Sequence, residues 1–182
     1  EGMNMNQQIH YAQQAPDLEL IDLNGKEIRL SSLWKDKPLV LAFTRHFGCT
    51  QCKQMLSQLV ENREKIESSG LGLAVITQGT GETLPEYSRT FAPGLYTLAD
   101  PERRAYLAYG LERGGIFQTF LNLKVWSALR QAKKEGLVSE LPPPGQDAMQ
   151  MAGLFIISKD GKVLMPFYYD NIADHPSIDL LL

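Results

Sequence analysis

The sequence predicts an α/β fold, in which a central mixed sheet is flanked by helices and preceded by an N-terminal β-hairpin. Residues 39–43 and 71–77 are apolar runs of strand length, and the segment between them has the periodicity of an amphipathic helix. A strand, a helix and a strand in this order predict a right-handed parallel crossover. Turn signals at residues 24–25 and 159–162 add a hairpin near each end of the chain. One mixed sheet with helices on both faces accommodates these elements.

The N-terminal hairpin is predicted from alternation and turn chemistry. Residues 16–23 (PDLELIDL) alternate apolar and polar side chains with a period of two, as a half-buried strand does. Asn24-Gly25 favours a tight turn, and residues 26–30 return as the partner strand. The run LVLAF at residues 39–43 is typical of a central strand that is covered on both faces.

The remaining elements follow from periodicity and from the residues that end helices. Apolar residues recur at helical spacing from Met55 to Ile66, and Gly70 ends that helix. Asp100 and Pro101 open another helix, as its cap and its first residue. The other predicted elements are helices at residues 86–91, 115–135 and 175–182, and strands at residues 71–77, 95–99, 153–158 and 163–169.

Composition and charge argue against several classes of function. A chain of 182 residues that is 43% hydrophobic and 21% charged fits one globular domain. The net charge is −3 and no run of Lys and Arg is present, so we expect no nucleic-acid partner. No apolar stretch approaches the roughly 20 residues that a spanning helix needs, so we expect no membrane partner.

We expect residues 1–14 to form a tail and residues 15–182 to form one domain. Glu1 and Gly2, which precede Met3, read as residues left by cloning and carry no weight in the fold prediction. The tail is polar and lacks the apolar segment of an export signal, so we expect a cytoplasmic protein. In that compartment a close cysteine pair is more often catalytic or metal-binding than a structural disulfide.

Cys49 and Cys52, the only cysteines in the chain, are the candidate catalytic pair. They stand between a central strand and the first turn of a helix, where the N–H groups and positive end of the helix stabilise a thiolate. A cysteine in this position can have its pKa lowered from about 8.5 to roughly 3.5–7.5, and Arg45, His46 and Lys53 would add positive charge. We expect Cys49 to be the more exposed thiol and the nucleophile. Cys52, one helical turn further on, is then the resolving thiol.

Two other interpretations of the pair are weaker. Cysteine is among the most buried residue types, and two of them at a helix start could fill space. A zinc site would need two further ligands. His46 is too close in sequence to be an easy partner, which leaves His10 and His175, and there is no second cysteine pair. We therefore expect redox chemistry with no metal and no organic cofactor.

Three stretches carry a resemblance to a known family: residues 15–43 (APDLELIDLNGKEIRLSSLWKDKPLVLAF), 98–111 (LADPERRAYLAYGL) and 153–163 (GLFIISKDGKV). They resemble, in this order, segments of the peroxiredoxins of the alkyl hydroperoxide reductase and thiol-specific antioxidant (AhpC/TSA) superfamily. The resemblance covers most of residues 15–169 and implies a thioredoxin-like fold. RHFGCTQC, MAGLFII and DNIADHPSIDLLL are similar to the peroxiredoxin-like branch that carries Cys-x-x-Cys.

Neither cysteine satisfies the sequence motif of that family. Peroxiredoxins usually place Pro seven residues and Thr three residues before the peroxidatic cysteine. Counting back from Cys52 gives Arg45 and Cys49, and counting back from Cys49 gives Ala42 and His46. Loop length after the strand favours Cys52 as the peroxidatic residue, whereas the helix-end argument favours Cys49, which we rank first.

Two further positions depart from related families. The arginine that peroxiredoxins usually carry three residues before the Phe of the closing strand is Ala152 here. Arg45 is the candidate substitute, and a surface charge is its equally weighted alternative. Residues 151–153 also lack the proline on which a substrate chain rests in thioredoxins, which argues against a thioredoxin-type activity.

The resemblance implies a thiol peroxidase in which Cys49 and Cys52 cycle between dithiol and disulfide. Its partners would be a hydroperoxide and an external thiol donor such as a thioredoxin or glutathione system. The alternatives are a thioredoxin-type protein disulfide oxidoreductase and a non-enzymatic redox sensor or binding protein. The predicted helix at residues 115–135 has a broad apolar surface, which core packing, a homodimer contact or a lid over the thiols would explain. Its members are Phe117, Phe120, Leu121, Leu123, Val125, Trp126 and Leu129.

Overall fold

The computed structural model describes residues 7–115, 123–171 and 176–182. Within these residues one seven-stranded sheet has the order β2-β1-β5-β4-β3-β6-β7. The strands are β1 (Glu19–Ile21), β2 (Glu27–Arg29), β3 (Leu39–Phe43), β4 (Gly72–Thr77), β5 (Tyr96–Ala99), β6 (Gly153–Ile157) and β7 (Val163–Tyr168). The helices are α1 (Ser31–Trp34), α2 (Thr50–Glu61), α3 (Arg63–Ser68), α4 (Leu84–Phe91), α5 (Arg104–Ala108) and α6 (Leu123–Lys134), with a 3-10 turn at Ile178–Leu180.

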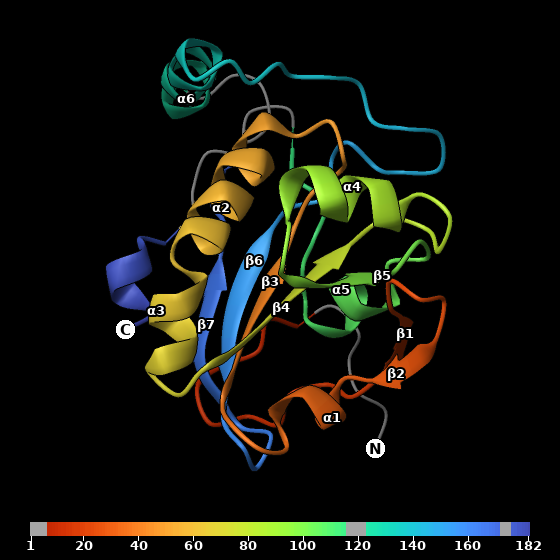
Figure 1. The fold of residues 1–182 in the computed structure, drawn as a ribbon, viewed down its shortest axis with the longest axis vertical. Helices are drawn as coiled ribbons and strands as arrows, with labels where there is room; N and C mark the ends of the chain where they lie inside the picture. The colour runs from red at the N-terminus through yellow and green to blue at the C-terminus, as the bar shows by residue number, and fades with distance from the viewer. Residues whose placement is uncertain (1–6, 116–122, 172–175) are drawn as a thin grey trace.

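The pairing of the strands confirms the predicted mixed sheet and N-terminal hairpin. Strand β3 is parallel to β4, and β4 is parallel to β5, as the crossover rule requires. Strand β3 is also antiparallel to β6, and the β1–β2 hairpin joins the sheet through an antiparallel contact with β5. Figure 1 shows α2 and α3 crossing one face of this sheet, with α6 beyond the N-terminal end of α2. No helix of the described residues has the length and hydropathy needed to cross a bilayer.

The continuous apolar character of β3 reflects a hydrophobic core on each face of the sheet. Leu39, Leu41 and Phe43 belong to one core, which is built with α1 and α5. Val40 and Ala42 point to the opposite face and belong to a second core, built with α2, α3 and α4. Because both faces are covered, β3 cannot move without disturbing both cores. The residues that directly follow it therefore start from a fixed position.

Two helix boundaries differ from the predictions. The helix after the cysteines is divided at Asn62 into α2 and α3. Helix α5 begins at Arg104 and not at Pro101, because Arg103 adopts a left-handed conformation with φ of 57°. The capping role of Asp100 is nevertheless confirmed. Its carboxylate accepts the N–H groups of Arg104 at 3.0 Å and Ala105 at 2.8 Å.

Of the predicted helix at residues 115–135, the structure describes α6 over Leu123–Lys134. Phe117, Phe120 and Leu121 lie outside the described residues. Val125 is buried, but Leu123 and Trp126 are 85% and 54% exposed. Core packing therefore explains only part of the apolar surface of this helix.

Replacing Phe43 by Ala should lower the free energy of unfolding by about 3–5 kcal/mol. The ring is fully buried and contacts the rings of Tyr106, Tyr109 and Phe155 at centroid distances of 5.2, 5.1 and 5.6 Å. Urea unfolding of the reduced protein measures the change. Leu164→Ala, at a 44% exposed position of β7, is the control and should stay within about 0.5 kcal/mol of the parent. Equal losses in the two variants would contradict the central position of Phe43.

Candidate active site

Both cysteines lie where β3 ends and α2 begins. Thr44 continues the pairing of β3 through its N–H, which donates to the carbonyl of Ile76 at 3.0 Å, and Tyr106 donates its hydroxyl to the Thr44 carbonyl at 2.7 Å. The chain then turns, and Cys49 becomes the N-cap of α2. The thiols are therefore placed by the rigid centre of the sheet.

The Cys49 sulfur accepts hydrogen bonds from the Cys52 thiol, the Cys52 backbone N–H and Arg45, and these stabilise its anion. The backbone N–H of Cys52 lies 3.2 Å from Cys49 Sγ, and Arg45 Nη1 lies 3.7 Å from it. Burial opposes ionisation, but the Cys52 thiol, the Arg45 charge and the Cys52 N–H together lower the pKa of Cys49 to about 6. Cys49 therefore exists largely as a thiolate at neutral pH.

Cys52 has the opposite electrostatic environment. Burial, the hydrogen bond to Cys49 and the negative charge of Cys49 raise the pKa of Cys52 well above its ordinary value. Its sulfur accepts the backbone N–H of Arg45 at 3.2 Å. Both thiols are free and buried, with Cys49 2% and Cys52 4% exposed. The expectation that Cys49 is the more exposed thiol was therefore wrong; what distinguishes it is that it lines a cavity.

Arg45 is a buried cation beside the thiols, and not a surface charge. It is 3% exposed, and its Nε donates to the carbonyl of Gln150 at 3.1 Å. Its Nη2 donates to the carbonyl of Ala148, which leaves Nη1 directed at Cys49 Sγ. The two carbonyls belong to the segment just before β6. The guanidinium thus lies against the segment that precedes Ala152.

A second set of hydrogen bonds holds that segment in place. The side chain of Gln78, one residue past β4, donates Nε2 to the carbonyls of Arg45 at 3.2 Å and Asp147 at 3.0 Å. Its Oε1 accepts the N–H of Asp147 at 2.7 Å. The Asp147 carboxylate forms ion pairs with Arg103 at 2.7 Å and Arg113 at 2.6 Å. Gln78 and Asp147 therefore connect both sides of the Arg45 pocket.

His46 and Lys53 differ from what the sequence suggested, because His46 is neutral near pH 7 and the charge of Lys53 is paired with Glu140. Burial, with the nearby charges of Arg45 and Lys53, lowers the pKa of His46 to about 4, so its imidazole is neutral near pH 7. Its Nδ1 accepts the N–H of Gly48 at 3.1 Å and so shapes the loop. Lys53 Nζ pairs with Glu140 at 3.2 Å and lies 4.5 Å above the ring centroid of Phe91.

Residues 139–142 cover the thiols. Glu140 donates its N–H to the Gly48 carbonyl at 3.1 Å, and a Cβ on Gly48 would collide with the carbonyl of Glu140. Beneath this cover lies a cavity of about 230 Å³ that Cys49 lines. Its other lining residues are Arg45, His46, Gln51, Leu129, Ser139, Glu140, Leu141, Pro142 and Ala148. The cavity combines one cation and one thiolate with apolar walls.

Gln51 presents an unused donor in this cavity. Its Nε2 is buried and has no hydrogen-bond partner among the residues that the structure describes. Its Oε1 lies 4.0 Å from Cys49 Sγ. A buried donor without a partner costs about 1–3 kcal/mol, so an acceptor bound in the cavity would relieve that cost.

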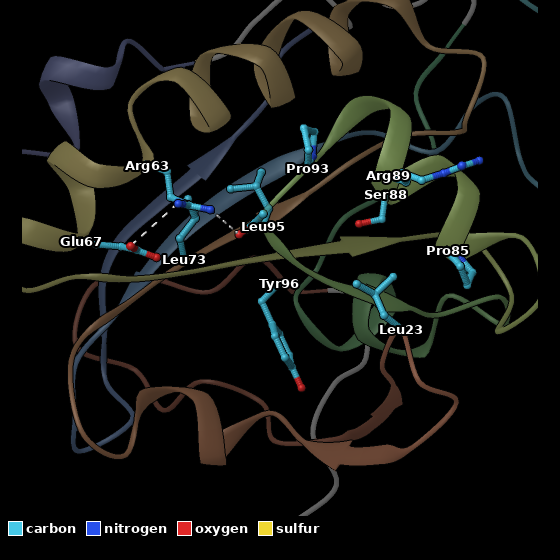
Figure 2. A pocket seen from close by; sticks show the side chains of 11 residues that line it. Leu23, Arg63, Glu67, Leu73, Pro85, Ser88, Arg89, Pro93, Leu95 and Tyr96 are labelled. Atoms are coloured by element: carbon cyan, nitrogen blue, oxygen red, sulfur yellow. Dashed lines mark hydrogen bonds and ion pairs between the residues drawn. The ribbon is translucent and has the colours of Figure 1, made fainter.

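A larger cavity, of about 530 Å³, lies near the amino ends of β4 and β5 (Figure 2), and neither cysteine lines it. Arg63 donates there to the Gly94 carbonyl at 3.1 Å and pairs with Glu67 at 3.9 Å, so its charge is already engaged. Figure 2 shows the Arg89 side chain pointing away from the other lining residues. We assign no chemistry to this cavity.

In the described part of the chain no three His, Cys, Asp or Glu side chains are grouped so as to hold a metal ion. His46 is bonded to the loop backbone, and His175 lies outside the described residues.

Sequence reasoning placed Cys49, Cys52 and Arg45 together but missed the glutamine and carboxylate groups that organise them. Gln78 carried one usable signal, because it directly follows a buried strand parallel to β3. Asp147 and Gln150 carried no comparable signal, since the loop that brings them to Arg45 has no periodicity.

Comparison with known proteins places the chain in a family context. The model of the AhpC/TSA family matches residues 11–165. The chain is 29% identical to prostamide/prostaglandin F synthase of Salmo salar, over 88% of this chain and 80% of that protein. It is 26% identical to peroxiredoxin-like 2C of Homo sapiens, over 91% of this chain and 76% of that protein. The crystal structure of a peroxiredoxin-like protein from Aquifex aeolicus matches with a TM-score of 0.65 at 15% identity, covering 97% of this chain and 86% of that one, which shows a shared fold.

Replacing Arg45 by Gln should raise the pKa of Cys49 from about 6 toward the 8.5 or so of a free thiol, because a positive charge and a donor are lost. A pH titration of the ultraviolet absorbance of the thiolate measures this pKa. Arg89→Gln, whose parent side chain is 79% exposed on α4, should leave the titration unchanged. An unchanged midpoint in Arg45→Gln would show that the N-terminus of α2 and Cys52 suffice.

The reduced protein should become more stable as pH rises from about 6 to about 9. In this window the unfolded chain largely keeps the Cys49 proton, since a free thiol has a pKa of about 8.5, whereas the folded protein has lost it at about 6. The unfolded state therefore binds more protons and the free energy of unfolding rises with pH, by at most about 1.4 kcal/mol per pH unit. This stabilisation is complete above pH 9 and is lost as pH falls through about 6.

Urea unfolding of the parent and of Cys49→Ser across this window tests the linkage. The variant should lose the rise between pH 6 and 9. It should keep the rise between pH 4 and 6.5, where unfolding lets neutral His46 take up a proton. The same slope in both proteins above pH 6 would exclude Cys49 as its source.

Proposed function

Because the chain belongs to the AhpC/TSA family, we propose that it is a thiol-dependent oxidoreductase that reduces hydroperoxides. Cys49 is the attacking thiolate, Cys52 is the resolving thiol, and Arg45 stabilises the anions that form. The observation that carries this proposal is the pair of unequal thiols at the N-terminus of α2, of which only Cys49 lines the covered cavity.

The first step is a displacement at oxygen. The Cys49 thiolate attacks one oxygen of the hydroperoxide, an S–O bond forms, and the O–O bond breaks. Sulfur is oxidised to a sulfenic acid, and the second oxygen leaves as an alkoxide or hydroxide that takes a proton from solvent. Arg45 Nη1, 3.7 Å from the sulfur, is near the negative charge as it moves to oxygen. The free Nε2 of Gln51 offers a further donor to the peroxide.

In the second step Cys52 condenses with the sulfenic acid. An S–S bond forms, the S–O bond breaks, and water leaves with the proton of Cys52. The raised pKa of Cys52 depends partly on the negative charge of Cys49. Oxidation of Cys49 removes that charge, which lowers the pKa of Cys52. Cys52 thus becomes easier to deprotonate at the step in which it attacks the sulfenic acid. An external thiol donor, such as a thioredoxin or glutathione system, then supplies two electrons and two protons to restore the pair.

Two features favour a small peroxide over a polypeptide disulfide. The cavity at Cys49 measures about 230 Å³ and is covered by residues 139–142, so it admits a small peroxide to the reduced protein directly, whereas a protein, including a thioredoxin that reduces the disulfide, needs the cover displaced first. The carbonyls of Ala148 and Gln150, ahead of β6, are already bonded to Arg45 and are not free to pair with an extended substrate. Because its Nη1 lies 3.7 Å from Cys49 Sγ, Arg45 also offers a physical substitute for the arginine that is absent at Ala152.

The apolar wall of the cavity extends the proposal to organic peroxides. Leu129, Leu141 and Pro142 are among the residues that line the cavity. The relative from Salmo salar is named a prostamide/prostaglandin F synthase, which is a name for an enzyme of organic substrates. We therefore include a bulky organic hydroperoxide beside hydrogen peroxide in the test below.

Stopped-flow oxidation of the reduced protein should be far faster than that of a free thiol and should end in a Cys49–Cys52 disulfide, as identified by mass spectrometry. Hydrogen peroxide and cumene hydroperoxide are the two oxidants. Cys49→Ser should lose the fast reaction, because no thiolate remains in the cavity. Cys52→Ser should keep the first step and stop at a sulfenic acid that dimedone traps.

Ser57→Ala, at an exposed position of α2, is the control and should react like the parent. Parent oxidation no faster than a free thiol with either oxidant would contradict the peroxidase. Rapid reduction of a protein disulfide such as insulin by the same preparation would then favour disulfide exchange. Oxidation that no donor reverses would favour a sensor. A fast reaction retained in Cys49→Ser would move the attacking role to Cys52.

A further inference from the structure

Helix α6 and the segment after it expose large apolar side chains beside the thiol cavity. Leu123 is 85% and Trp126 54% exposed on α6, and Val138 and Leu141 in the following segment are 68% and 90% exposed. Leu123 and Trp126 are three residues apart and share one side of the helix. Val125 and Ala132, on the opposite side, are buried. Both an inner and an outer side of α6 are therefore apolar in part.

The outer side of α6 is also positively charged. Arg130, Lys133 and Lys134 are exposed, and no residue from 123 to 134 is acidic, although the whole chain has a net charge of −3. Within the described residues no carboxylate lies within ion-pairing distance of these three side chains. The adjacent Glu135 accepts instead from Gln54 at 2.8 Å and from Gln131 at 2.9 Å.

Helix stability alone does not explain this arrangement. Lys133 and Lys134 in the last turn interact favourably with the helix dipole. Arg130 and Lys134, however, are like charges four residues apart, which destabilises a helix by a few tenths of a kcal/mol. An exposed tryptophan and leucine that share one side of α6 with unpaired cations instead present apolar groups and positive charge to the same surface. Tryptophan favours the headgroup region, and the cations favour anionic lipids.

From this combination we infer that the outer side of α6 docks on an anionic phospholipid surface. Leu123 and Trp126 enter the headgroup region, while Arg130, Lys133 and Lys134 contact lipid phosphates. The expectation of no membrane partner rested on the lack of a spanning segment, and a helix lying on the surface needs none. Since Leu129 of α6 and the exposed Leu141 line the Cys49 cavity, docking would bring its covered mouth close to the lipid.

A lipid surface fits these features better than a second copy or a protein partner does. A second copy docked on the same side would bring these three cations into one interface twice, and no residue of α6 is acidic and able to pair with them. An acidic protein would match the charge but leaves the exposed Trp126 unexplained unless it also offers an apolar groove. A bilayer interface provides anions and an apolar layer within a few ångströms of each other.

The test is cosedimentation of the reduced full chain with vesicles of phosphatidylcholine alone and of phosphatidylcholine mixed with phosphatidylserine. Binding is expected only to the mixed vesicles and should fall as salt rises from about 0.1 M to about 1 M, because the Debye length shortens from about 10 Å to about 3 Å. Tryptophan fluorescence gives a second readout. Of the two tryptophans, Trp34 is 4% and Trp126 54% exposed, so a blue shift on binding reports Trp126.

Two variants and two matched controls make the test specific. The triple variant Arg130→Gln, Lys133→Gln and Lys134→Gln should lose about tenfold or more in partitioning, as expected for three surface cations. Leu123→Ser with Trp126→Ser should lose binding and the blue shift. The first control is the triple variant Lys26→Gln, Lys35→Gln and Lys159→Gln, and the second is Leu164→Ser. All four positions are exposed and away from α6, so both controls should bind like the parent. Circular dichroism and the titration of Cys49 should be unchanged in every variant.

Each other outcome overturns the inference. Equal binding to both kinds of vesicle would exclude recognition of anionic lipid, and loss of binding in the controls as much as in the α6 variants would make the attraction non-specific. No binding to either vesicle would remove the membrane as the partner. A concentration-dependent dimer that dissociates in the Leu123→Ser, Trp126→Ser variant, without vesicle binding, would assign the surface to self-association. Because no turnover is measured, a failed peroxidase assay leaves these results standing.

Discussion

The buried guanidinium of Arg45 is the interaction on which the thiol site depends. It leaves β3 two residues after the strand ends, donates to two carbonyls ahead of β6, and directs its remaining nitrogen to Cys49. A buried cation is tolerable only when partners replace its lost hydration. Here two carbonyl oxygens and a thiolate do so. The same contacts that satisfy the arginine therefore fix the distance between β3, the loop ahead of β6 and the N-terminus of α2.

The two sulfurs differ although they stand one helical turn apart. Cys49, at the N-cap, receives an N–H and faces the guanidinium, so its anion is stabilised despite burial. Cys52 is inside the helix and next to that anion, so its own ionisation is opposed. Each state depends on the other, because the proton kept by Cys52 is the one that hydrogen-bonds to Cys49. The difference in pKa between the two thiols thus arises from their positions relative to Arg45, to the N-terminus of α2 and to each other.

The cover over the thiols comes from a part of the chain distant in sequence. Residues 139–142 follow α6 and reach Cys49 through the contact between Glu140 and Gly48. Helix α6 packs one side against the second core while its other side carries exposed Leu123 and Trp126. The segment that shields the thiols therefore directly follows a helix that exposes large apolar side chains. For this reason, we expect that a surface in contact with α6 would change the access of substrates to the thiols.

The sequence by itself determined the sheet, the position of the cysteine pair and the polarity of its surroundings in outline. Alternation, continuous apolar runs and turn residues are local properties, so they could be read at LVLAF and Asn24-Gly25 without coordinates. Only the tertiary structure decided what Arg45, His46 and Cys49 do. Burial turns Arg45 from a surface charge into a ligand of the thiolate and keeps His46 neutral. These outcomes depend on residues about 100 positions away, and such long-range contacts leave no periodic trace in a single sequence.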